Sequence, residues 1–131
     1  MNFETLLFNQ DKRGVVSLTL NRPEKRNALS GKMIDELTNF TSLLTPDIRA
    51  VVIQGAGKLF CAGGDLDWMS NQITADRLTR ISEARKLAMM LKALNEIPVP
   101  LIGKIHGAAY GGGVGLACLL YTSDAADDVV G

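Results

Sequence analysis

The sequence predicts a single α/β domain with helices packed on both faces of its sheet. Two short strands open the chain, and after them apolar runs alternate with longer segments of helical periodicity. This alternation is typical of layered α/β folds, in which each element buries its apolar side against another layer. Hydrophobic residues make up 47% of the 131 residues, the composition of a globular domain. No internal repeat or linker divides the chain.

The opening segment predicts an antiparallel hairpin. Residues 3–8 and 15–20 read as strands, and the polar, glycine-containing sequence 11–14 supplies the turn between them. Asn21-Arg22-Pro23 then ends the second strand, because proline cannot donate to a sheet ladder.

The next segment predicts a helix and a buried strand. Ser30 is a suitable N-cap for a helix that runs to about Leu44, before Pro46. Residues 50–53 are all apolar, which favours a strand buried on both faces.

The second half predicts two helices and a strand. A short helix is expected around 65–70 and a longer one from about Thr74 to Asn95. A strand at 99–105 follows, and 106–113 form a loop that leads into a further helix. The apolar stripe of the long helix consists of Leu78, Ile81, Leu87, Leu91 and Leu94, and we expect Met89 and Met90 to pack in the core.

Composition excludes several functional classes. Fourteen basic and 14 acidic residues give a net charge of zero, which argues against nucleic-acid binding. Two cysteines and one histidine are too few soft ligands for a zinc site. The N-terminus lacks the features of a secretory signal, and no apolar stretch is long enough to span a membrane. We therefore expect a cytoplasmic protein with no metal, no membrane partner and no nucleic-acid partner.

Two glycine-rich windows carry the strongest chemical signal. Ten of the 13 glycines lie at 55–64 and 103–115, each window following an apolar strand. Glycine lets backbone N–H groups face a ligand at close range. Two such donors directed at one point form an oxyanion hole, although tight turns and close packing are the alternative explanation of the same glycines.

Three segments together resemble the enoyl-CoA hydratase/isomerase (crotonase) superfamily. They are Leu20 to Leu29 (LNRPEKRNAL), Leu59 to Leu66 (LFCAGGDL) and Pro98 to Gly113 (PVPLIGKIHGAAYGGG). The resemblance covers about residues 3–118 and implies a spiral of ββα units, truncated here after about its first half. It also implies an acyl-CoA thioester substrate, no cofactor other than the coenzyme A carried by the substrate, and a homotrimer or hexamer for the full-length protein.

The resemblance assigns site residues by position. The oxyanion-hole donors, and so the catalytic groups, would be the backbone N–H groups of Gly64 and Gly112. Asn27 and Ala28 would line the coenzyme A site, and Lys25 and Arg26 would approach its phosphates, although a solvated pair of charges is an equal reading of these two. The full set of expected substrate-binding residues is Lys25, Arg26, Ala28, Ala62, Gly64, Asp65, Leu66, Tyr110, Gly112 and Gly115.

One position departs from the best-known hydratases of this superfamily. Gly115 stands where those enzymes carry a glutamate that acts in water addition, as in members that resemble methylglutaconyl-CoA hydratases. The resemblance therefore implies an acyl-CoA hydratase present as a fragment, itself inactive. The alternatives are isomerase, decarboxylase or thioesterase chemistry, which use the same oxyanion hole, or a non-catalytic remnant.

Residues 119–131 do not resemble the family. Three acids and no base lie in this segment, and we interpret 1–118 as the N-terminal part of the domain and 119–131 as an atypical tail, with read-through into non-coding sequence as an explanation. We expect the strand at 99–105 to lack later neighbours, which leaves Leu101, Ile105, Leu116 and Leu119 partly in water. The isolated chain should then be prone to aggregation.

Other reactive residues have simpler explanations. Cys61 and His106 form a nucleophile–base pair only if an orienting acid is near, and none is evident. Asp65 precedes a helix, where an aspartate more often caps the helix than acts as a general base. Trp68 and Met69 are expected to line a pocket or the core.

Overall fold

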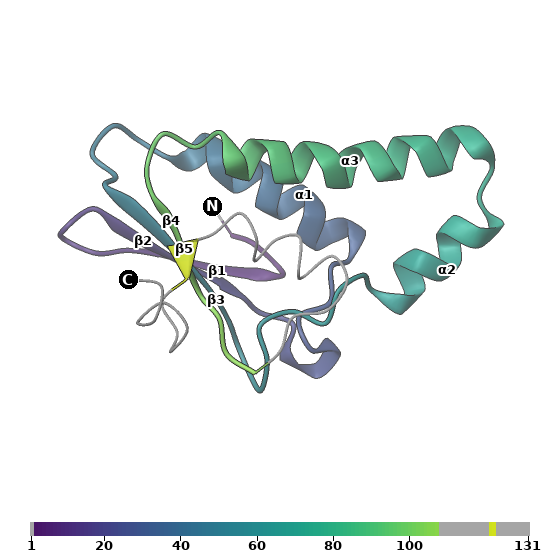
Figure 1. Ribbon diagram of the computed structural model, residues 1–131, viewed down its shortest axis with the longest axis horizontal. Coiled ribbons are helices and arrows are strands. Elements are labelled where there is room, and N and C mark those ends of the chain that lie inside the picture. Colours follow the sequence, from purple (N-terminus) through teal and green to yellow (C-terminus); the bar gives the residue numbers. More distant parts are fainter. Residues whose placement is uncertain (1, 108–120, 123–131) are drawn as a thin grey trace.

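The computed structural model describes residues 2–107 and 121–122, in which helices lie over one face of a sheet (Figure 1). The sheet has the order β1-β2-β3-β4-β5, and its strands are Leu6–Gln10, Val15–Leu20, Ala50–Gly55, Leu101–Lys104 and Tyr121–Thr122. β1 pairs with β2 antiparallel, and each later pair is parallel. The predicted α/β class is confirmed, and the parallel strands place the loops after β2, β3 and β4 at one edge of the sheet.

The predicted hairpin is present, with its first strand shifted. Gly14 adopts a φ of 83°, and the Asp11 carboxylate accepts hydrogen bonds from the N–H groups of Arg13 and Val15 at 2.8 and 3.0 Å. β1 was expected at 3–8 but begins at Leu6. The N–H groups of Glu4 and Thr5 instead donate to the Glu36 carboxylate, each at 2.8 Å, and only the Thr5 carbonyl bonds to the neighbouring segment, accepting from the Asn21 N–H directly after β2.

Helix α1, Gly31–Phe40, begins where the sequence predicts. The Ser30 hydroxyl accepts a hydrogen bond from the Met33 N–H at 3.2 Å, which confirms Ser30 as the N-cap. The expected end at Leu44 is wrong. The chain tightens into a 3-10 turn, η2 (Thr41–Leu43), where the Thr41 and Ser42 hydroxyls donate to carbonyl groups three residues back.

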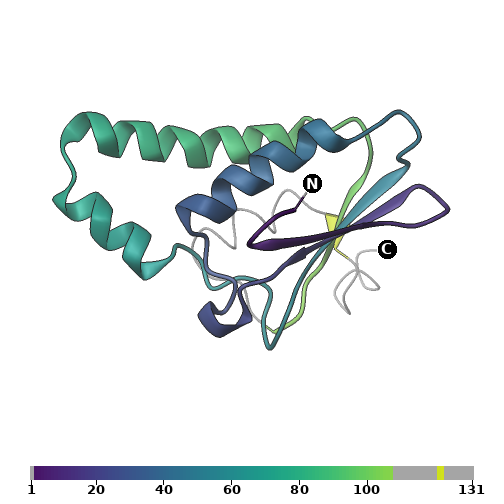
Figure 2. The same ribbon diagram turned by 180° about the vertical axis from the view of Figure 1, so that it is seen from behind.

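Two helices follow β3. α2 covers Leu66–Thr74 and is longer than predicted, and α3 covers Arg77–Asn95. α3 begins later than Thr74 because the Asp76 side chain caps it, accepting from the Thr79 N–H at 2.8 Å. α3 runs beside α1 and extends past the sheet, with α2 near its far end, as both ribbon views show (Figure 2). A 3-10 turn, η1 (Pro23–Lys25), follows β2.

The core lies between α1, α3 and one face of the sheet. Alternate strand residues are buried, among them Val16, Leu18 and Leu20 of β2 and Val51 and Ile53 of β3. They pack in one cluster against helix residues Met33, Ile34, Leu37, Phe40, Met90 and Leu94. The expectation that residues 50–53 are buried on both faces is wrong among the described residues. Ala50 and Val52 are only half-buried, because α1 and α3 cover one face alone.

The predicted apolar stripe of α3 holds only in its second half. Leu87, Leu91 and Leu94 pack on the core, whereas Leu78 is 79% exposed and Ile81 is 46% exposed. Met90 is buried as expected, but Met89 is 48% exposed. The first half of α3 extends beyond the sheet, so its apolar side chains have no described strand beneath them (Figure 1).

The strand after α3 is not left without a neighbour. Ile102 and Gly103 of β4 pair with Tyr121 and Thr122 of β5. Leu101, expected to stand partly in water, is buried at 5% exposure, and Ile105 packs against the core from a half-buried position. Leu116 and Leu119 lie outside the described residues.

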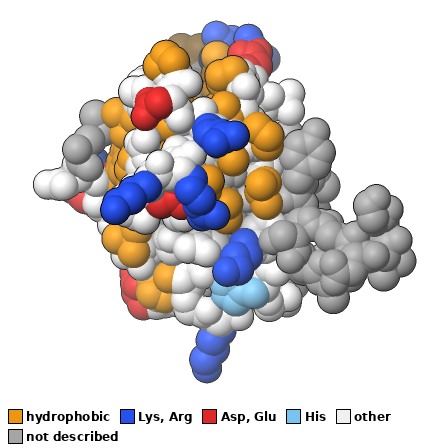
Figure 3. Space-filling view, turned by 90° about the vertical axis from the view of Figure 1, so that its left-hand side faces the viewer, with side chains coloured by type: hydrophobic (Ala, Val, Ile, Leu, Met, Phe, Trp, Pro, Cys, Tyr) orange, Lys and Arg blue, Asp and Glu red, His pale blue; other side chains and the backbone are white. Residues whose placement is uncertain are grey.

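The described surface mixes charged and apolar side chains. On the face shown in Figure 3, Lys and Arg side chains are separated by hydrophobic and uncharged surface. Among the described residues, no helix has the length and apolar character needed to cross a bilayer.

Candidate functional site

The loops after β2 and β3 are joined at the carboxyl edge of the sheet, where open α/β sheets usually bind ligands. The Ala62 N–H donates to the Arg26 carbonyl at 3.0 Å, and the Leu29 N–H donates to the Gly63 carbonyl at 2.7 Å. The loop after β4 joins them through the His106 carbonyl, which accepts from the Phe60 N–H at 2.9 Å. The first glycine window therefore meets the described start of the second, residues 103–107, at one edge.

Asn27 holds two of these loops together from inside. Its side-chain amide donates to the carbonyls of Ala56 and Leu59 at 2.8 and 3.1 Å, and its Oδ1 accepts from the Arg22 N–H at 2.8 Å. Asn27 is fully buried and has a φ of 56°, a left-handed conformation that asparagine tolerates. The expectation that Asn27 lines a ligand site is wrong, because every polar atom of its side chain is turned into the protein.

Two cavities meet at this edge. One has a volume of about 440 Å³ and apolar walls: Leu29, Ile34, Ala62, Gly63, Gly64, Leu66, Trp68, Met69 and Leu87. The other has a volume of about 470 Å³ and carries charges: Glu24, Lys25, Arg26, Ala28, Ala62, Gly64, Asp65, Leu66 and Asp67. Ala62, Gly64 and Leu66 line both cavities, so a ligand with an apolar end and a charged end can place their junction at Gly64.

The peptide between Gly63 and Gly64 has a fixed direction. The Gly63 carbonyl points to the Leu29 N–H, and the Asp65 N–H donates to the Leu29 carbonyl at 2.9 Å. The chain has no cis peptide among the described residues. Because a trans peptide holds N–H and C=O in opposite directions, the Gly64 N–H points away from Leu29. It donates no hydrogen bond to another described residue.

Gly63 makes this direction attainable. Its φ is 97°, a conformation that side chains rarely adopt. The second glycine differs, because a Cβ on Gly64 would meet only side chains, that of Met69 at 3.1 Å from its sulfur and that of Trp68 at 3.9 Å. Gly63 thus sets the backbone, and Gly64 offers the N–H group to a ligand.

The structure brings together most of the predicted site residues. Lys25, Arg26, Ala28, Ala62, Gly64, Asp65 and Leu66 all line the charged cavity. Tyr110, Gly112 and Gly115 lie outside the described residues, so the second oxyanion donor, Gly112, stays a prediction. The binding roles of the other residues also stay predictions.

Asp65 is a helix cap. Its Oδ1 accepts from the Trp68 N–H at 3.0 Å, and its Oδ2 lies 3.0 Å from Nη2 of Arg22. Burial raises the pKa of the Asp65 carboxyl, but the hydrogen bonds from Trp68 and Arg22, with the charge of Arg22, hold that pKa below its ordinary value. Asp65 is therefore ionised at neutral pH, and both of its carboxylate oxygens already accept hydrogen bonds. The interpretation of Asp65 as a helix cap is confirmed, and it is favoured over a role as a general base.

Cys61 is not a nucleophile in this structure. The residue is fully buried, and this burial raises the pKa of its thiol. A protonated thiol is a weak nucleophile. The only His, His106, is exposed and bonds through Nε2 to the Gly57 carbonyl at 2.8 Å. No group of three His, Cys, Asp or Glu side chains among the described residues is placed to hold a metal ion.

The sequence reasoning missed part of the site. It placed Trp68 and Met69 on a pocket or core surface, and both line the apolar cavity. Leu29, Ile34 and Leu87 were not foreseen there, although Leu87 belonged to the predicted apolar stripe of the long helix. Arg22 was placed at a strand end and inside the first family segment, but it was given no role of its own.

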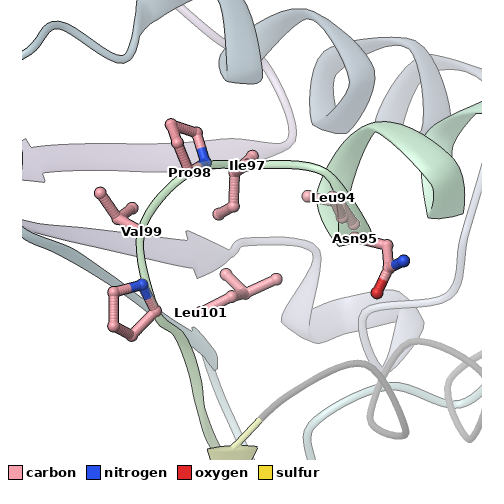
Figure 4. Close-up of a pocket in the computed structure, with 7 residues that line it drawn as sticks. Leu94, Asn95, Ile97, Pro98, Val99 and Leu101 are labelled. Carbon is pink, nitrogen blue, oxygen red and sulfur yellow. The ribbon is translucent and has the colours of Figure 1, made fainter.

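A further cavity lies at the opposite edge of the sheet. It has a volume of about 440 Å³ and is lined by Leu94, Asn95 and residues 97–101, which lead from α3 into β4 (Figure 4). Its only lining side chain with a polar group is that of Asn95, so it offers no group for acid–base or nucleophilic chemistry.

Comparison with known proteins identifies related sequences. The family model described as enoyl-CoA hydratase/isomerase matches residues 10–127. A probable enoyl-CoA hydratase of Mycobacterium bovis is 38% identical over 129 residues, which cover 97% of this chain and 48% of the relative. A mitochondrial Δ(3,5)-Δ(2,4)-dienoyl-CoA isomerase of Mus musculus is 34% identical over 125 residues, covering 88% of this chain and 38% of the isomerase.

Solved structures give the same result. An enoyl-CoA hydratase of Mycobacterium smegmatis superposes with a TM-score of 0.82 and 36% identity, covering 88% of this chain and 45% of that one. An enoyl-CoA hydratase of Shewanella pealeana superposes with a TM-score of 0.86 and 30% identity, covering 91% of this chain and 45% of that one. The chain spans about half the length of the curated hydratases that it matches.

Proposed function

This chain belongs to the enoyl-CoA hydratase/isomerase family. On this basis we propose that the protein binds an acyl-CoA thioester where the two cavities meet. The crotonase-type fold expected from the three sequence segments is confirmed. The single observation that carries the proposal is the position of Gly64, which lines both the apolar and the charged cavity and whose N–H donates no hydrogen bond to another described residue.

The two cavities match the two ends of such a substrate. The acyl chain enters the apolar cavity, whose walls include Trp68, Met69 and Leu87. The phosphate-bearing part lies in the charged cavity, where Lys25 and Arg26 supply cations beside the carboxylates of Glu24 and Asp67. The thioester carbonyl then lies at Gly64.

The reaction proceeds through stabilisation of charge on the carbonyl oxygen. A backbone N–H directed at this oxygen stabilises the enolate that forms when a proton or hydroxide is transferred at the neighbouring carbons. Gly64 supplies one donor, and Gly112 is proposed as the second. Coenzyme A enters and leaves with the substrate, so the reaction requires no other cofactor.

Hydration of an enoyl-CoA is the reaction we favour, with isomerisation of the double bond as the second candidate. The named hydratases among the relatives support the first, and the dienoyl-CoA isomerase supports the second. No described carboxylate lines the apolar cavity. We therefore propose that the acid–base group that acts on the acyl carbons lies outside residues 2–107.

Calorimetric titration of the chain tests the proposed binding. We expect butanoyl-CoA to bind more tightly than coenzyme A, because the acyl chain fills the apolar cavity and the carbonyl oxygen accepts from Gly64. Free butanoate should not bind measurably, since it lacks the part that occupies the charged cavity. Equal binding of butanoyl-CoA and coenzyme A, or no binding of either, would contradict the proposal.

A further inference from the structure

A part-buried ion pair lies beside Gly64, because its acid, Asp65, follows Gly64 in the sequence and lines the charged cavity with it. Nη2 of Arg22 is 3.0 Å from Oδ2 of Asp65, and the two side chains are only 16% and 8% exposed. The other terminal nitrogen of Arg22, Nη1, donates to the Ala28 carbonyl at 2.5 Å. One guanidinium therefore bonds to both loops, to the 22–28 turn through Ala28 and to the start of α2 through Asp65.

The loop that Arg22 secures is the loop that directs Gly64. Ala28 precedes Leu29, and Leu29 bonds on one side to the Gly63 carbonyl and on the other to the Asp65 N–H. Leu29 and Gly64 thus form an isolated parallel β-bridge, in which the two residues that flank Gly64 both hydrogen-bond to Leu29. Shifting residues 28–29 against residue 65 would rotate the 63–64 peptide, and with it the Gly64 N–H.

We infer that Arg22 is a positioning residue for the thioester carbonyl, acting through Asp65 and Ala28 to keep the Gly64 N–H directed at the junction of the two cavities. This inference rests on the proposed function. Arginine suits the role because its planar fork bonds to two acceptors at once, which the single ammonium of lysine does not reproduce. Arg22 itself lines neither cavity, so it acts without touching the substrate.

The experiment compares how well variants discriminate the thioester from coenzyme A alone. Dissociation constants for butanoyl-CoA and coenzyme A are measured by calorimetry for the wild-type chain and for Arg22→Met. We expect the dissociation constant of coenzyme A divided by that of butanoyl-CoA to fall at least fivefold in Arg22→Met, because only the thioester loses its directed donor, whereas the lost charge beside Asp65 affects both ligands alike. In ¹⁵N spectra, the Gly64 amide shift that butanoyl-CoA induces in the wild type should be lost in the variant.

Two further variants make the result decisive. Arg13→Met is the matched control, because Arg13 also pairs with an aspartate, at 2.7 Å, but is 77% exposed and distant in the hairpin turn. It should keep the wild-type ratio. Arg22→Lys keeps the charge without the fork and should give an intermediate ratio; it replaces Arg22→Met if that variant does not fold.

A merely structural role for Arg22 predicts a different result. The folded variant would then be less stable but would keep the wild-type ratio and the Gly64 shift, and this outcome would overturn the inference alone. If the wild-type chain already fails to discriminate butanoyl-CoA from coenzyme A, the proposed function fails, and the inference fails with it.

Discussion

Two adjacent glycines, Gly63 and Gly64, have different roles, and an alanine substitution at each position distinguishes these roles. Gly63→Ala places a side chain at a φ of 97° and should destabilise the chain by about 1–3 kcal/mol. Gly64→Ala leaves the backbone acceptable, but its methyl group would stand 3.1 Å from the Met69 sulfur in the apolar cavity. We expect Gly64→Ala to fold nearly as well as the wild type and to bind butanoyl-CoA less tightly. Urea unfolding and calorimetry measure the two effects.

Gly31→Ala is the control for both substitutions. Gly31 begins α1, and a Cβ there would meet Trp68 at an ordinary contact distance of 3.5 Å. It should neither destabilise the chain nor weaken ligand binding. Equal stability of Gly63→Ala and Gly31→Ala would contradict the conformational role of Gly63.

At the scale of elements, Glu36 ties α1 to the entrance of β1. Its carboxylate accepts from the N–H groups of Glu4 and Thr5 and from the Thr5 hydroxyl at 2.6 Å. Burial raises the pKa of the Glu36 carboxyl, but these hydrogen bonds outweigh burial and leave the pKa below its ordinary value. The ionised form is therefore the one that the folded chain prefers.

The sign of the pH dependence follows from this lowered pKa. The contribution of Glu36 is fully present above its unfolded pKa of about 4.3 and is lost as the pH falls through the folded pKa. The free energy of unfolding should thus decrease on acidification below about pH 5. Glu36→Gln should cost about 1–3 kcal/mol at pH 7 and flatten this decrease.

Asp35→Asn is the control for Glu36, because Asp35 is the neighbouring acid on α1 and is exposed. It should leave the stability at pH 7 within about 0.5 kcal/mol of the wild type. Urea unfolding at pH 3 to 7 gives both comparisons. An unchanged pH dependence in Glu36→Gln would show that other carboxylates account for the acid sensitivity.

For the whole molecule, the exposed apolar surface on α2 and α3 predicts self-association. Leu66 is 81% exposed, and Ile73 and Leu78 are each 79% exposed. Apolar side chains gathered on one surface promote association. We expect the chain to bind a hydrophobic dye and to scatter light increasingly with concentration. The double substitution Ile73→Ser and Leu78→Ser should reduce both signals without lowering the melting temperature.

Leu7→Ser is the comparison for this surface, since Leu7 is 54% exposed but lies on β1. If Leu7→Ser reduces association as much as the double substitution, α2 and α3 are not its source.

We also expect little enoyl-CoA hydration by the chain alone, because no described carboxylate lines the apolar cavity. A spectrophotometric assay of crotonyl-CoA hydration checks this, and sizeable turnover would contradict it.

Features that depend on neighbouring residues could be predicted from the sequence. The polar turn before Val15, the Ser30 cap and the Asp65 cap are all local, because each side chain bonds to backbone within four residues. The three ordered segments were also enough to identify the family. Element ends were less accurate: β1 begins at Leu6 because Glu4 and Thr5 bond to Glu36, more than 30 residues away.

The sequence by itself determined the α/β class, the family and most of the residues that line the charged cavity, though not Glu24 and Asp67. Only the tertiary structure decided which groups act together there. The direction of the Gly64 N–H depends on Leu29, and the Arg22–Asp65 pair joins residues 43 positions apart. The same holds for α3, whose regular apolar pattern is buried only where the sheet lies beneath it. Periodicity and capping are properties of a segment, whereas burial and the direction of a peptide group are set by what the fold brings alongside it.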